Sequence, residues 1–329
     1  MEIKTEYFNE VFEPEGKVRE RYRPLFEALE RMGEEEFATR CERAGERLRE
    51  LGATFPLPDN PEGQDRILPA DWIPRIIPKD HREILSIGLL QRGNAINAWL
   101  VDLYNGEQDV VPEEIVSSSV FYRPGPLPDY SVPIHVYGPD VMQLGPKEYV
   151  VLEDNVRVPS GVAYSEAIRR AMLEAMGDLY EPYRVSAISA YYAVLKRSLE
   201  TAAPPGVDEP CVAVVSRGEV RDRSDGRRID VIYRRFDEDY IETDLPELEG
   251  AYLEGRVNIV NALGVGVADD KAVFPYVPAM IERYLGEKPL LQNVPTLSPT
   301  EPEGREEVLD RLDELVLKPR EGAGDRASS

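Results

Sequence analysis

Three oxygen-bearing side chains follow one apolar stretch of the chain, where a strand is expected to end. They come directly after residues 150–152 and are Glu153, Asp154 and Asn155, with Arg157 two positions later. Carboxylate and amide oxygens suit a hard divalent cation such as Mg²⁺, and an arginine suits a phosphate. Because alternate residues of a strand point to the same side, Glu153 and Asn155 can face one ion while Asp154 faces away. The simpler alternative is a polar exit from a strand that holds no ligand.

Further cations follow apolar runs later in the chain. Arg235 ends the run that starts at residue 229, and Lys318 ends the run at residues 315–317. Lys271 follows two acids at the start of a predicted helix. Cations placed in this way can pair with a phosphate, although each lysine can equally lie on a solvated face. The pattern favours a phosphate-binding site but leaves the solvent-exposed alternative open.

The elements expected to hold these residues alternate between helices and strands, which is typical of an α/β (α+β) protein. Apolar residues at spacings of three and four predict a helical head over residues 17–51, with Gly52 as its C-cap. Prolines predict an extended segment over residues 52–80. The later elements are expected as a helix at 80–105, strands at 133–137, 141–144 and 148–154, helices at 164–176 and 189–199, strands at 212–215 and 229–233, helices at 270–285 and 306–312, and a strand at 315–318.

Composition excludes several classes of function. Lys plus Arg number 39 against 62 Asp plus Glu, a formal net charge of −23, which repels nucleic-acid phosphate and anionic membranes. Cys41 and Cys211 are expected to be core thiols, and two histidines leave little for a zinc site or a Ser-His mechanism. The apolar runs are too short for a membrane span. We therefore expect a cytoplasmic protein that binds neither nucleic acid nor membrane.

These stretches, in this order, resemble the circularly permuted ATP-grasp proteins of the type 2 family, which are also labelled glutathionylspermidine-synthase-like. The resemblance covers about residues 71–324. It rests on four strings in the same order along the chain: residues 151–161, 231–237, 264–284 and 293–296. It implies an ATP-grasp-like fold that holds Mg-ATP between two sheets. Such an enzyme activates a carboxylate as an acyl phosphate, and an amine or thiol then displaces the phosphate.

The resemblance also implies how the chain divides. Residues 1–60 would form a helical N-terminal extension, residues 61–324 a partial circularly permuted ATP-grasp domain, and residues 325–329 a disordered tail. Two departures from the family imply an incomplete nucleotide-binding lobe. Family members carry an extra segment where only residues 216–228 stand here, and they continue with a long stretch beyond residue 324.

The resemblance assigns the metal and the reacting groups to particular residues. Glu153 and Asn155 match the Glu-x-Asn metal pair of related permuted glutathione synthetases. Glu321 is the candidate for a third Mg²⁺ ligand, and a solvated loop acid is its alternative. Arg157 and Arg235 are the candidates for holding the substrate carboxylate and the transferring phosphoryl group, because a guanidinium suits both anions.

Other residues are assigned to ATP. Lys271 and Lys318 match the lysines that contact the nucleotide in the family. Gly322 and Gly324 would let backbone N–H groups approach phosphate closely. Ser160 could supply a hydroxyl to an anion, although a simple turn explains it equally well.

Three functional interpretations follow. In the first, the chain is an ATP-dependent carboxylate–amine or carboxylate–thiol ligase that acts on small molecules or peptides. In the second, it is a catalytically deficient ATP-grasp remnant that serves as a binding or scaffold module. In the third, a partner chain completes the truncated lobe, which predicts an unpaired apolar edge near residues 315–317.

Overall fold

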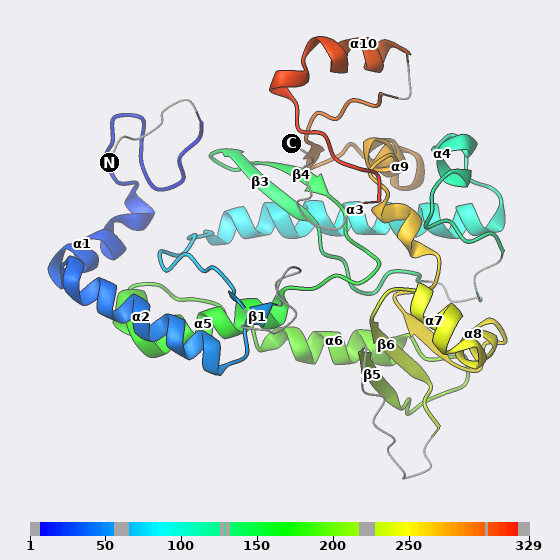
Figure 1. The fold of residues 1–329 in the computed structure, drawn as a ribbon, viewed down its shortest axis with the longest axis horizontal. Helices are drawn as coiled ribbons and strands as arrows, with labels where there is room; N and C mark the ends of the chain where they lie inside the picture. Colours follow the sequence, from blue (N-terminus) through cyan, green and yellow to red (C-terminus); the bar gives the residue numbers. More distant parts are fainter. Residues whose placement is uncertain are drawn as a thin grey trace. The chain divides into compact units, whose positions relative to one another are not determined.

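A computed structural model describes residues 7–55, 66–125, 128, 132–216, 228–299 and 302–321. The chain divides into two compact units (Figure 1). Unit 1 comprises Met1–Lys79 and Ser160–Tyr192, and unit 2 comprises Asp80–Pro159 and Ala193–Ser329. The expected domain boundaries at residues 60 and 324 stay predictions.

Unit 1 is built mainly from helices. They are η1 (Glu20–Tyr22), α1 (Arg23–Met32), α2 (Glu34–Glu50), α5 (Val162–Met176) and η2 (Gly177–Tyr180), beside a short antiparallel pair, β1 (Thr54–Phe55) and β2 (Arg66–Ile67). The predicted apolar stripe of α2 packs against α5, where Ala44 and Met176 are fully buried. The helical head is not one helix, because Gly33, at φ +79°, separates α1 from α2.

Unit 2 contains two small sheets. In the first, β3 (Asp140–Gly145) pairs antiparallel with β4 (Glu148–Glu153), and β4 pairs parallel with β8 (Gln292–Asn293). The long helix α3 (Lys79–Asn105) packs beside this sheet and buries Trp99 and Leu100 in the largest core cluster. The sequence predicted α3 and β4 to within one residue at each end.

The second sheet of unit 2 is parallel. Its strands are β5 (Val212–Ser216), β6 (Val231–Arg235) and β7 (Asn258–Val260), in that order. Val231 and Tyr233 pack with Leu199 of α6 (Ala190–Thr201), whereas Ile232 packs with the core that contains Ile241. Because β6 is covered on both faces, its first three residues are apolar without alternation. Ile241 belongs to α7 (Asp239–Asp244), which precedes α8 (Pro246–Leu253) (Figure 1).

Three predicted elements are wrong. Residues 133–137 form no strand, because their backbone bonds to a side chain instead: Asn261 Oδ1 accepts from His135 N (2.9 Å) and Val136 N (3.0 Å). The helix expected at 270–285 is broken into η4 (Phe274–Tyr276), α9 (Val277–Met280) and the π-helical η5 (Ile281–Leu285), after η3 (Val265–Asp269). The strand expected at 315–318 is absent because no described strand pairs with it.

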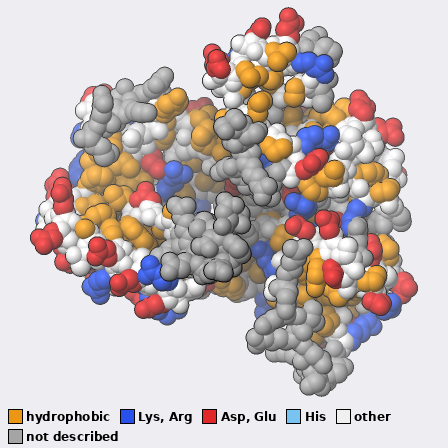
Figure 2. Space-filling view, viewed as in Figure 1, with side chains coloured by type: hydrophobic (Ala, Val, Ile, Leu, Met, Phe, Trp, Pro, Cys, Tyr) orange, Lys and Arg blue, Asp and Glu red, His pale blue; other side chains and the backbone are white. Residues whose placement is uncertain are grey.

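The remaining helices are α4 (Glu113–Ser117), α10 (Pro302–Asp310) and η6 (Leu312–Glu314). After η6 the chain is extended, and Val316 is 77% exposed. The net charge of −23 implies many acidic side chains on the surface. Figure 2 shows them spread over the visible face rather than gathered in one patch. Over the described ranges, no helix is long and apolar enough to cross a membrane.

Candidate functional site

The polar residues at the end of β4 divide between two sides of the strand. Asp154 is buried and accepts hydrogen bonds from Arg92 Nε (2.7 Å) and Arg92 Nη2 (2.6 Å) of α3. The hydroxyl of Tyr137 donates a further bond to Asp154. Arg92 also donates to Asn293 Oδ1 of β8, at 2.7 Å. The prediction that Asp154 faces away from Glu153 is confirmed, and its contacts fix the end of β4 against α3 and β8.

Glu153 lies between two predicted nucleotide-contacting lysines. Its Oε2 is 3.5 Å from Lys271 Nζ and 3.6 Å from Lys318 Nζ. The side chain of Asn155 also lies close enough to Glu153 to help lower the pKa of its carboxyl group. Burial raises the pKa of Glu153, but Lys271, a hydrogen bond with Asp140, Lys318 and Asn155 together hold it below its ordinary value. The structure thus brings three predicted site residues, Lys271, Lys318 and Asn155, to the carboxylate of Glu153.

Asp140 is an acid that sequence reasoning missed. It stands directly opposite Glu153 in the β3–β4 pair, so the two side chains share one face of the sheet. The register of this pair shifts between Gln143 and Gly145 and again between Asp140 and Val141, so no simple count from the turn identified Asp140 in the sequence. Two carboxylates in contact, with the amide of Asn155 beside them, form an oxygen donor set that fits a hard cation.

The described residues contain no cluster of three His, Cys, Asp or Glu side chains that could hold a metal ion. Mg²⁺ is a different case, because it needs only one or two protein carboxylates when water and phosphate complete its coordination. The pair of Asp140 and Glu153 meets that lower requirement.

Arg320 holds the chain that carries Lys318. Its Nε and Nη2 donate to the two carboxylate oxygens of Asp270, at 3.0 and 2.8 Å. It also donates to Ser118 Oγ and to the carbonyl oxygen of Ile115, both at 3.0 Å. Asp270 is buried. No sequence signal distinguished Arg320 from a solvated arginine, because its partners are far away along the chain.

Arg157, four residues after Glu153, is held by two carboxylates and an aromatic ring. Its Nε is 3.2 Å from Asp269 Oδ2, and its Nη1 is 3.5 Å from Asp237 Oδ1. Its guanidinium carbon lies 4.1 Å from the centroid of the Phe121 ring. A Cβ at Gly266 would lie 2.6 Å from Arg157 Cδ, so this position requires glycine. The side chain of Arg157 is therefore fixed on four sides.

Asp269 connects the Arg157 contacts to the Glu153 cluster. Its carboxylate accepts hydrogen bonds from the backbone N–H groups of Val156 (2.5 Å) and Arg157 (3.2 Å). Burial raises the pKa of Asp269 to about 6, although these N–H groups and the charge of Arg157 act in the opposite direction. Since Lys271 follows Asp269 by two residues, one short segment supplies partners to both Arg157 and Glu153.

Arg235 ends β6, as predicted. Its Nη1 donates to the carbonyl oxygen of Pro159 (2.6 Å) and to the hydroxyl of Tyr233 (3.1 Å). Arg234 points the other way, into the core, and its Nη2 donates to Glu238 Oε1 at 3.0 Å. The turn between β6 and α7 brings Glu238 back to Arg234.

The other predicted site residues are not placed in this cluster. Ser160 is exposed and belongs to unit 1. Glu321 is exposed and makes no described contact with Glu153 or Asn155. Gly322 and Gly324 lie outside the described residues. Their proposed roles stay predictions.

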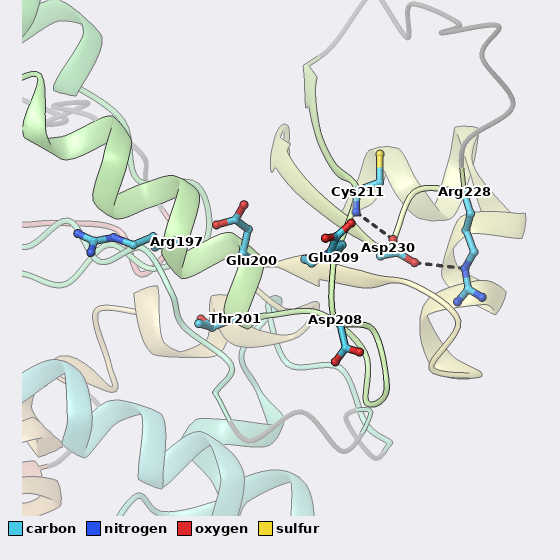
Figure 3. A pocket seen from close by; sticks show the side chains of 9 residues that line it. Arg197, Glu200, Thr201, Asp208, Glu209, Cys211, Arg228 and Asp230 are labelled. Carbon is cyan, nitrogen blue, oxygen red and sulfur yellow. Dashed lines mark hydrogen bonds and ion pairs between the residues drawn. The ribbon is translucent and has the colours of Figure 1, made fainter.

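Two of the cavities in the described part of unit 2 are considered as possible binding sites. One, of about 380 Å³, is lined by a predicted site residue: its walls are Val120, Phe121, Tyr122, Arg123, Pro124, Arg157, Glu238, Asp239 and Glu249. The other is open, has about 860 Å³ and lies where β5 and β6 begin. Figure 3 shows its lining, in which Asp230 accepts from Cys211 N and pairs with Arg228. No predicted site residue lines the second cavity.

A family model described as a circularly permuted ATPgrasp matches residues 74–223 and 219–328. These ranges cover most of the chain and contain the whole Glu153 cluster.

This chain belongs to the circularly permuted ATP-grasp family.

Several curated proteins are similar to this family member over nearly its whole length. The uncharacterized protein sll0335 of Synechocystis sp. is 36% identical over 97% of this chain and 76% of its own length. The uncharacterized protein Rv2411c of Mycobacterium tuberculosis is 36% identical over 96% of this chain and 66% of its own length. A Frankia alni protein named "Putative glutamate--cysteine ligase 2-3" is 36% identical over 96% of this chain, which spans 42% of that protein.

The alignments are longer than this ATP-grasp chain. The alignment with the Synechocystis protein extends over 368 positions, whereas the chain has 329 residues, so at least 39 positions have no counterpart here. The two ranges matched by the family model meet at residues 219–223. These residues fall within the link, residues 216–228, where the sequence predicted a missing segment.

Proposed function

We propose that this chain is an ATP-dependent ligase that joins a carboxylate to an amine or a thiol through an acyl phosphate. Membership of the ATP-grasp family and the name of the Frankia protein support the general class of ATP-dependent ligase, without identifying the substrates. One observation carries the proposal for this chain. Lys271 and Lys318 meet at Glu153, next to the side chains of Asp140 and Asn155. Lysines suited to bind phosphate therefore lie beside oxygen atoms suited to bind a metal ion.

In this proposal, Asp140, Glu153 and Asn155 hold Mg²⁺. Asp140 stands opposite Glu153 in the β3–β4 pair, which supports their fit to a cation, because a positive charge between two neighbouring carboxylates relieves their mutual repulsion. When bound, Mg²⁺ would neutralise charge on the phosphates of ATP. Lys271 and Lys318 would then leave Glu153 and pair with those phosphates, since the metal takes over their electrostatic role at the carboxylate.

Arg157 and Arg235 bind the acidic substrate in this proposal. Phosphoryl transfer requires the carboxylate and the γ-phosphorus to be held in line while charge spreads over the transferring group. Arg157 suits the task because Asp269, Asp237 and Phe121 restrict its orientation before any ligand binds. Arg235 lies at the end of β6, where its contact with Pro159 directs it toward the segment that follows Arg157.

The substrates are proposed as small molecules or peptides that carry a carboxylate and an amine. The name of the Frankia relative supports acids and amines of the amino-acid type. Because this chain spans 42% of that relative, the activity of the longer protein is extended to it only as part of this proposal.

Trapping the acyl phosphate tests the proposal directly. The chain is incubated with Mg-ATP, a mixture of amino acids and hydroxylamine, and the hydroxamate and ADP are quantified together. Lys318→Ala should abolish both products. The matched control, Lys288→Ala, removes an exposed lysine outside the cluster and should leave both unchanged. Equal product from the wild type and Lys318→Ala would contradict the proposal.

Two observations favour a second function, a binding module without catalysis. Residues 315–318 form no strand, and at least 39 positions of the Synechocystis alignment have no counterpart in this chain. A module of this kind would bind Mg-ATP and release no ADP with any acid in the mixture. The same incubation, combined with a nucleotide-binding measurement, separates the two functions.

A further inference from the structure

The cavity beside Arg157 has one aromatic side and one charged side. Phe121 and Tyr122 supply the aromatic side, while Arg123, Glu238 and Asp239 supply part of the charged side. Its volume of about 380 Å³ is sufficient for a small organic molecule. The chemistry of this lining determines which kind of molecule it can hold.

The first arginine of the cavity is already paired with carboxylates. Arg123 Nε is 2.8 Å from Glu238 Oε2, and Arg123 Nη1 is 3.2 Å from Glu249 Oε1. Glu238 also accepts from Arg234 and from the backbone N–H of Gly264. An incoming carboxylate would have to displace these acids from Arg123, so this side of the cavity does not favour an anion.

The second arginine is paired in the same way. Arg157 lies between Asp269 and Asp237, and its flat face covers Phe121. Asp237 has the more exposed side chain, at 59%, and it remains accessible to a ligand. Both arginines of the lining therefore have acid partners, and Asp237, which does not itself line the cavity, keeps an accessible carboxylate beside Arg157.

Asp239 adds a further negative charge. Its side chain is exposed, lines the cavity, and forms no ion pair with any cation in the described part of the chain. The lining of the cavity holds three carboxylates, Glu238, Asp239 and Glu249, against two arginines, Arg123 and Arg157. This excess of negative charge favours a cation over an anion.

We propose that this cavity binds the acceptor amine of the ligase reaction in its ammonium form. Asp239 and Asp237 would receive the ammonium group, and the hydrocarbon part of the amine would lie against Phe121 and Tyr122. This inference rests on the proposed function, in which an anionic acyl phosphate binds to lysines and arginines. A cationic acceptor then needs a neighbouring site of opposite charge, and Arg157 stands between the two sites.

Calorimetric titration with 1,4-diaminobutane tests the amine site without nucleotide. We expect saturable binding to the wild type, about tenfold weaker binding to Asp239→Asn, and no detectable binding to Asp239→Lys. The matched control is Asp208→Asn, which removes an exposed acid from the other cavity of unit 2 (Figure 3) and should leave the affinity unchanged. Asp239 is exposed at the start of α7, so these variants should fold, and circular dichroism verifies this.

Two results would overturn the inference. One is an equal affinity of Asp239→Asn and Asp208→Asn for the diamine. The other is a carboxylate probe, such as butanoate, that binds better than the diamine and loses affinity in Arg123→Gln. Failure of the proposed function is distinguishable, because diamine binding that depends on Asp239 would stand even if no hydroxamate forms. Conversely, hydroxamate formation without such diamine binding would overturn the amine site alone.

Discussion

Arg320 and Asp270 form a two-point ion pair, with nitrogen–oxygen distances of 3.0 and 2.8 Å, and the carboxylate of Asp270 is fully buried within it. The pair holds the C-terminal described segment against the segment that bears Lys271. Lys318, two residues before Arg320, reaches Glu153 from this attachment. The position of one proposed nucleotide-binding lysine therefore depends on a contact outside the cluster itself.

Replacing Arg320 by alanine should release that segment. We expect the free energy of unfolding to fall by about 2 kcal/mol, because Asp270 would keep a buried charge without its partner. The affinity for Mg-ATP should fall as well, and urea denaturation and calorimetry measure the two effects. Arg311→Ala removes an exposed arginine that pairs only within its own helical turns, and it should change stability by less than about 0.5 kcal/mol. Equal stability of the two variants would refute this role of Arg320.

Replacing Asp154 by alanine should be among the most destabilising single changes in unit 2. Arg92 would remain fully buried with a positive charge and no carboxylate, a situation that typically reduces stability by about 3–5 kcal/mol. Urea denaturation of Glu20→Ala provides the comparison, because Glu20 forms an exposed pair with Arg23. A loss below about 1 kcal/mol for Asp154→Ala would show that the pair does not anchor β4.

Asp269 should give the protein a characteristic dependence on pH. Burial raises its pKa from 3.8 to about 6, so the folded state binds this proton more tightly than the unfolded chain does. Its contribution to the free energy of unfolding therefore falls as pH rises from about 4 to about 6, by up to about 3 kcal/mol. Denaturation of the wild type and of Asp269→Asn across this pH range should show that the stability advantage of the wild type shrinks as pH rises. A constant difference would contradict the assignment.

Gly266 should tolerate no side chain, because a Cβ there would lie 2.6 Å from Arg157 Cδ and 3.1 Å from Phe121 Cβ. We expect Gly266→Ala to lower stability by about 1–3 kcal/mol and to reduce hydroxamate formation by displacing Arg157. Gly250→Ala is the control, since Gly250 lies in α8 with no atom within 4 Å of the added Cβ. That change should raise stability by about 0.5–1 kcal/mol. Denaturation midpoints that move in the same direction would contradict this view of Gly266.

Elements with strong local signals could be predicted from the sequence. The apolar spacing and flanking residues of α3 and β4 gave bounds that agree with the structure within one residue. The alternation of side chains along β4 likewise placed Asp154 opposite to Glu153. These predictions succeeded because helix periodicity and strand alternation depend only on neighbouring residues.

Features set by distant partners could not be predicted in the same way. The apolar residues 315–317 read as a strand, but a strand forms only where a partner supplies hydrogen bonds, and the described chain offers none there. Residues 133–137 also read as a strand, although Asn261 binds their backbone with its side chain. Arg320 and Asp270 are 50 residues apart, so no local pattern joins them.

Titration of the chain with a non-hydrolysable ATP analogue and Mg²⁺ measures whether the Glu153 cluster binds nucleotide. We expect micromolar affinity, about −8 kcal/mol, that requires Mg²⁺, is lost in Lys318→Ala and Glu153→Gln, and is retained in Lys288→Ala. Equal binding by the wild type, Lys318→Ala and Glu153→Gln, or no binding by a chain that circular dichroism shows to be folded, would contradict it.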